Sequence, residues 1–70
     1  MQFEENEKYK IVVVGADNKP RIYGLIISKD MKEEVTGIDD FGTERCFKKA
    51  MIAEYAKIRE GGRNGNIEFN

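Results

Sequence analysis

After the isolated Met1 and Phe3, the apolar residues of the first half of the chain are concentrated in two runs, at residues 9–14 and 21–28, with a polar segment between them. Both runs are rich in β-branched and aromatic side chains, which favour strands. The segment that separates them, Gly15-Ala16-Asp17-Asn18-Lys19-Pro20, has the composition of a turn. This pattern predicts a β-hairpin. A third, weaker strand is expected at Val35-Thr36-Gly37-Ile38, because a glycine lies in its interior.

The spacing of the apolar residues changes in the second half of the chain. Four of them recur at intervals of four, four and three, which places them on one stripe of a helix: Phe47, Met51, Tyr55 and Ile58. Thr43 can act as the N-cap, and Gly61 stands where a left-handed C-cap is favoured. The residues between them include many strong helix formers. We therefore predict a helix over residues 43–60.

Together these elements predict an α+β fold, with a three-stranded antiparallel sheet packed on one C-terminal helix. Residues 1–70 are expected to form a single small domain, with a flexible arm at residues 1–7 and a flexible or edge-strand tail at residues 61–70. The alternative is a small five-stranded barrel of the SH3/Sm-like type, in which residues 45–58 form two strands broken near Ala50. The density of alanine and lysine in this segment favours the helix.

The pairing of the hairpin predicts an apolar surface without cover. If Gly15 lies opposite Arg21, the odd-numbered apolar residues of both strands share one face, which the helix stripe can cover. The opposite face carries four further apolar residues: Val12, Val14, Ile22 and Ile26. A single helix cannot cover both faces, and an uncovered apolar patch is typical of an interface. These four residues are the predicted partner-binding site, unless the tail, the arm or closure of a barrel covers them.

Few residues in the chain can support catalysis. Histidine is absent, and Cys46 and Ser28 are the only cysteine and the only serine, so neither has a histidine to act as its base. The acidic residues between positions 30 and 40 lack the alternating spacing of a calcium loop. We expect a protein that is not an enzyme and uses no metal or cofactor.

Charge and composition narrow the choice of partner. The formal net charge of −1 provides no global field for nucleic acid or an anionic membrane. A single cysteine and the absence of a signal-like start predict a cytoplasmic protein. We expect a protein-binding module that forms a homodimer or acts as an accessory or inhibitor protein, without a small-molecule substrate. Its size is typical of small accessory proteins from a bacterium or phage. The alternative is a nucleic-acid-binding module that uses four residues of the hairpin: Lys8, Lys10, Arg21 and Tyr23.

Overall fold

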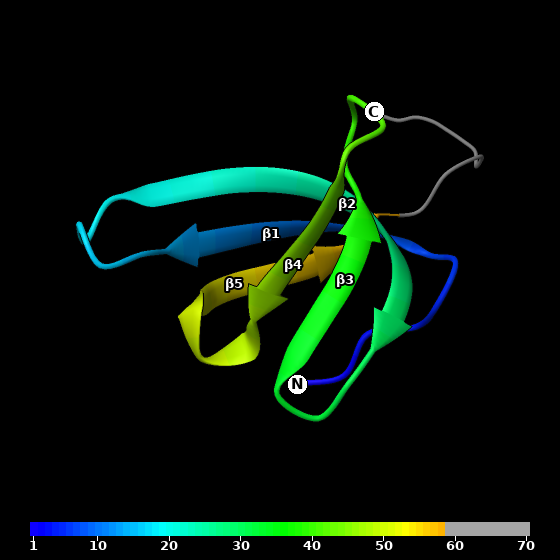
Figure 1. The fold of residues 1–70 in the computed structure, drawn as a ribbon, viewed down its shortest axis with the longest axis horizontal. Helices are drawn as coiled ribbons and strands as arrows, with labels where there is room; N and C mark the ends of the chain where they lie inside the picture. The colour runs from blue at the N-terminus through cyan, green and yellow to red at the C-terminus, as the bar shows by residue number, and fades with distance from the viewer. Residues whose placement is uncertain (59–70) are drawn as a thin grey trace.

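A computed structural model describes residues 1–58, and in this part of the chain the protein is all-β (Figure 1). The elements are β1 (Lys8–Val14), β2 (Pro20–Asp30), β3 (Glu34–Ile38), β4 (Glu44–Lys48), a short 3₁₀ turn η1 (Lys49–Met51) and β5 (Ile52–Lys57). They form one antiparallel sheet with the strand order β4-β3-β2-β1-β5. The α+β prediction is therefore wrong, and the five-stranded SH3/Sm-like alternative fits better.

The segment predicted as a helix is the main correction. Instead of one helix, residues 44–57 form β4, η1 and β5. Strand β1 has a second edge, and β5 fills it by pairing Tyr55 with Ile11 and Lys57 with Tyr9. These long-range hydrogen bonds outweigh the local preference of alanine and lysine for a helix. The end of the predicted helix and the proposed tail strand at residues 66–69 lie outside the described residues.

The predicted hairpin and third strand are confirmed, but the pairing of the hairpin differs. Val12 lies opposite Ile22 and Val13 opposite Arg21, a register two residues away from the predicted pairing of Gly15 with Arg21. The turn is tight because Asn18 adopts a positive φ of 62° and its N–H donates to the carbonyl of Gly15. Side chains alternate between faces with a period of two, so a shift of two residues leaves each on its predicted face.

The core lies between two halves of the curled sheet. Figure 1 shows β3 and β4 crossing over β1 and β5, with β2 running between the two pairs. The register between β2 and β3 shifts between Ile27 and Lys29, and such an irregularity bends a strand. The buried residues come from the arm, β1, β2, β3 and β5: Phe3, Tyr9, Ile11, Val13, Leu25, Ile27, Val35 and Ile52.

The arm at residues 1–7, expected to be solvated, contributes to this core. The side chain of Phe3 is only 4% exposed, and its ring meets that of Tyr9 edge-on at 4.9 Å between centroids. The N–H of Glu4 donates to the Tyr9 hydroxyl, and the Lys57 ammonium pairs with the Glu4 carboxylate at 2.8 Å. The arm, β3 and β4 therefore cover the face of β1 and β2 that the sequence predicted a helix would cover.

Candidate protein-binding surface

The side of β1, β2 and β5 that points away from the core is called the outer face here. All four residues of the predicted partner-binding site lie on it: Val12, Val14, Ile22 and Ile26. The side chain of Ile22 is 66% exposed and that of Ile26 is 48% exposed, whereas the two valines are half-buried. On β3, Ile38 lies opposite Ile26 and extends the apolar surface. The structure thus places the four predicted residues on one exposed, largely apolar face.

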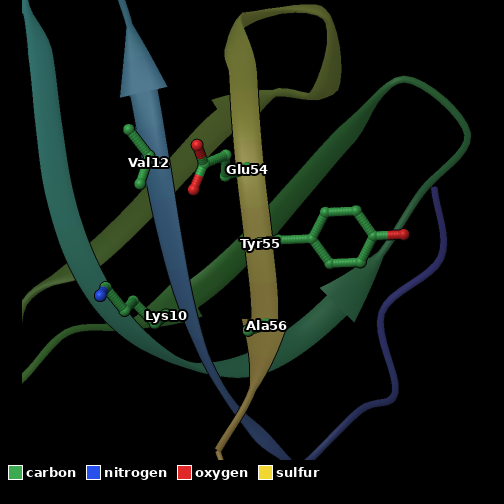
Figure 2. A pocket seen from close by; sticks show the side chains of 5 residues that line it. All are labelled: Lys10, Val12, Glu54, Tyr55 and Ala56. Carbon is green, nitrogen blue, oxygen red and sulfur yellow. The ribbon is translucent and has the colours of Figure 1, made fainter.

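A shallow hollow of about 100 Å³ opens on the outer face between β1 and β5 (Figure 2). Its lining comes from two strands: Lys10, Val12, Glu54, Tyr55 and Ala56. Lys10 lies between two small residues, Gly24 on β2 and Ala56 on β5, so the sheet surface is low on either side of it. Figure 2 shows the side chains of Val12 and Glu54 next to each other, while the Tyr55 ring points away.

Sequence reasoning missed this hollow, because it placed residues 54–56 on a helix. The alternative interpretation, in which residues 45–58 form two strands, could have revealed it. In an antiparallel pair of β1 with β5, the small Ala56 and the charged Glu54 come to the same face as Lys10 and Val12.

The turn between β3 and β4 presents a second feature that the sequence did not reveal. Phe41 lies in this turn, and its side chain is 91% exposed, the highest value among the exposed large hydrophobic residues that the structure describes. The turn is held by the carboxylate of Asp39, which accepts hydrogen bonds from the N–H groups of Phe41 and Thr43, each at 2.9 Å. It also accepts one from the Arg45 guanidinium at 2.9 Å. Gly42 supplies the positive φ of 81° that the turn requires.

These bonds affect the acidity of Asp39. The hydrogen bond from the Thr43 N–H, followed by that from the Arg45 side chain, lowers the pKa of the Asp39 carboxyl from its usual value. Both donors stabilise the charged form of the carboxylate. The turn is therefore most ordered when Asp39 is ionised.

A salt bridge attaches the same turn to the outer face. The Lys8 ammonium pairs with the Asp40 carboxylate at 2.9 Å. The salt bridge passes close to Gly24, where a Cβ atom would lie 3.0 Å from the second carboxylate oxygen of Asp40, so a side chain there would require the carboxylate to shift slightly. Figure 1 shows the turn projecting beyond the end of the sheet. Phe41 is thus exposed at the tip of a turn that is fixed against the apolar face.

The residues of the alternative nucleic-acid site do not form one cluster. Lys8 and Lys10 lie on the outer face, whereas Arg21 and Tyr23 lie on the opposite face of the hairpin. The Arg21 guanidinium pairs with the Asp17 carboxylate at 2.7 Å, and this hydrogen bond lowers the pKa of Asp17. The Tyr23 ring packs on Phe47, with 4.8 Å between centroids.

The two candidate nucleophiles make contacts within the sheet. The thiol of Cys46 is exposed and lies 3.6 Å from the Glu34 carboxylate. The hydroxyl of Ser28 donates to the carbonyl of Thr36 at 3.1 Å. Within residues 1–58 there is no group of three or more acidic, cysteine or histidine side chains arranged to hold a metal ion. The same residues include no helix long and apolar enough to cross a membrane.

Comparison of the chain with protein-family models, with curated proteins and with solved structures finds no match. Its functional assignment therefore depends on the geometry of its own surface. Two features of that surface are most prominent, namely the apolar outer face with its hollow and the exposed Phe41 beside it.

Proposed function

We propose that this protein is a small, non-enzymatic protein-binding module of the cytoplasm, which associates with itself or acts as an accessory or inhibitor protein. The observation that carries the proposal is the exposure of three large apolar side chains on or beside one face: Ile22, Ile26 and Phe41. Exposed large apolar residues that group on one side of a protein are typical of interaction sites. The outer face is the binding surface, with Val12, Val14, Ile22 and Ile26 at its centre.

The energetics of burial support this assignment. Full burial of a Val, Ile or Phe side chain contributes roughly 1.5–3 kcal/mol. Ile22 and Phe41 retain most of their area in the isolated chain, so a partner can gain this energy without unfolding anything. The bonds to Asp39 also hold the Phe41 turn in place before binding, which reduces the entropy lost on association.

The distribution of charge favours a protein partner over nucleic acid. Two of the basic residues proposed for phosphate contacts already have carboxylate partners, Lys8 with Asp40 and Arg21 with Asp17. Phosphate would have to displace these carboxylates, and the net charge of −1 adds no attraction. The two hypotheses differ in salt dependence, because binding to phosphates weakens steeply with added salt whereas burial of the outer face does not.

A photo-crosslinking amino acid at position 22 tests the proposal in living cells. Position 32 serves as the matched control, because Lys32 is also exposed but lies in the loop between β2 and β3, away from the outer face. We expect a discrete protein adduct, with this chain or another, from position 22 and none from position 32. Identical adduct patterns from both positions, or adducts to nucleic acid from position 22, would contradict the proposal.

A further inference from the structure

A protruding side chain lies beside the outer face, and a recess lies on that face. The protrusion is Phe41, presented by a turn that a salt bridge from Asp40 fixes to Lys8 on β1. The recess is the hollow between β1 and β5, which begins at Lys10, two residues along the same strand and on the same face. A protrusion and a recess on the same molecule can meet twice in a two-fold symmetric dimer, because each protomer then supplies both halves of the contact.

The size of the hollow suits an aromatic ring. Its volume of about 100 Å³ is somewhat smaller than the cavity of about 150 Å³ that binds benzene in an engineered protein core. Because the hollow is open to the surface, a ring can rest in it without being enclosed. The lining includes the apolar side chain of Val12 and the methyl group of Ala56.

The recess carries charges of both signs, the Lys10 ammonium and the Glu54 carboxylate, and the ammonium is opposite in sign to the residue beside the protrusion. Within residues 1–58 the Lys10 ammonium takes part in no ion pair, although it lies at the edge of an apolar surface. The residue next to Phe41 is Asp40, whose side chain is 59% exposed despite its contact with Lys8. When Phe41 enters the hollow of another molecule, the carboxylate of Asp40 approaches the ammonium of that molecule's Lys10.

We propose that the partner of the outer face is a second copy of this chain, and that Phe41 of each protomer binds in the hollow beside Lys10 of the other. This inference rests on the proposed function and specifies its partner. The dimer brings the two apolar outer faces together, with Ile22 and Ile26 between them. It contains the contact of Phe41 with the hollow twice, and the pair of Asp40 with Lys10 twice.

Sedimentation velocity of the purified full chain over a range of concentrations tests the inference. We expect a reversible dimer for the wild-type protein. Phe41→Ala is expected to raise the dimer dissociation constant at least about 100-fold, because the truncated contact occurs twice and buried aromatic residues dominate interface energies. Its circular dichroism spectrum should not change, since Phe41 contributes nothing to the core. Met51→Ala is the matched control, because Met51 is 40% exposed but lies in η1.

A charge exchange tests the second contact. Lys10→Glu and Asp40→Lys should each weaken the dimer, and the loss in the double variant should be smaller than the sum of the two single losses, because the exchanged charges again attract each other. The effect of Asp40→Lys on its pair with Lys8 is present in both the single and the double variant, so it does not enter this difference. Additive losses in the double variant would contradict the pairing of Asp40 with Lys10.

Three results would overturn the proposal that Phe41 of each protomer binds in the hollow of a second copy. These are a wild-type protein that sediments as a monomer at every concentration, a Phe41→Ala variant that dimerises like wild type, and a cross-link from position 22 to residues 59–70 of the same chain. If the protein is monomeric but position 22 captures a different protein, the proposed function stands and only the second copy is wrong. If position 22 also captures nothing, both proposals fail.

Discussion

Two phenylalanines with similar sequence surroundings have opposite roles in this protein. Phe3 and Phe41 are each a lone aromatic residue in a polar, acidic stretch. Phe3 is buried between the rings of Tyr9 and Tyr55, at 4.9 and 5.1 Å between centroids, whereas Phe41 is 91% exposed. Nothing local to either residue distinguishes them. The difference arises from which strands pass close to each in the folded chain.

This contrast gives a matched pair of truncations. We expect Phe3→Ala to lower the free energy of unfolding by about 3–5 kcal/mol, because it removes a buried ring and leaves a cavity. Phe41→Ala should change it by less than about 0.5 kcal/mol, since no buried contact is lost. Urea denaturation of both variants, at a concentration where the wild type is monomeric, provides the measurement. A Phe3→Ala variant that is as stable as the wild type would show that Phe3 is not part of the core.

Gly37 shows why one residue that looked like a weakness is needed. The sequence made the third strand doubtful because a glycine lies inside it. In the structure, a Cβ atom at this position would lie 2.7 Å from the carbonyl oxygen of Ile26 on β2. The glycine therefore allows β3 to approach β2 closely, a requirement that its own sequence neighbours do not reveal.

Among the elements, the turn between β3 and β4 combines order with exposure. The Asp39 side chain is only 5% exposed and holds the turn through its hydrogen bonds, whereas Phe41 extends into solvent. The Arg45 guanidinium that pairs with Asp39 also lies 5.5 Å from the centre of the Tyr23 ring, so the turn is connected to the hairpin. The sequence predicted the third strand that precedes this turn, but not the contacts that hold the turn.

The turn makes stability depend on pH in a defined direction. The pKa of Asp39 is lowered in the folded protein from its ordinary value of 3.8, and so is that of Asp17 in the hairpin turn. The unfolded chain therefore takes up protons first as the pH falls. The stabilisation from each carboxylate is fully present above the unfolded pKa and is lost as the pH falls through the folded pKa.

Urea midpoints measured from about pH 6 down to about pH 3 report this loss. We expect Asp39→Asn to give a flatter pH dependence than wild type, because asparagine keeps an acceptor for the turn but does not titrate. Asp17→Asn should remove a separate part of the pH dependence of stability. The double variant should remove both parts, since the two turns share no hydrogen-bond partner. An Asp39→Asn variant with the full wild-type slope would contradict the assignment.

At the scale of the whole molecule, pairing between distant strands decides the structure of residues 44–57. These residues contain good helix formers, yet β4 pairs with β3 and β5 pairs with β1. The buried side of β5 begins with Ile52, which joins the core, and the Lys57 ammonium pairs with Glu4 in the arm. The contacts of β5 join residues that are far apart in the sequence, so helix propensity and spacing do not report them. Strand β4, in contrast, pairs with the strand that directly precedes it.

Amide hydrogen exchange distinguishes a helix from strands in this segment. Because β4 and β5 stand at the two ends of the strand order, each pairs with a neighbour on one side only. We expect protection at alternate amides over residues 44–48 and 52–57, and slower exchange in β1, which has a neighbour on both sides. A continuous run of protected amides from residue 47 onward would restore the helix.

The sequence by itself determined the hairpin, the third strand and the division of side chains between the two faces of β1 and β2. These features follow from local turn chemistry and from the period of two, which survived an error of two residues in the register. It also identified Val12, Val14, Ile22 and Ile26 as residues of one face.

Only the tertiary structure decided the fate of residues 43–58, the burial of Phe3, the exposure of Phe41 and the hollow beside Lys10. The exposure of Phe41 depends on the turn between β3 and β4, whereas the hollow and the contact of Phe3 with Tyr55 depend on which strand occupies the second edge of β1. That choice is made by long-range hydrogen bonding and burial, and these can override the modest free-energy differences of intrinsic helix propensity. A prediction based on local propensity therefore finds the residues of β1 and β2 on the outer face, but not the strand β5 that borders them.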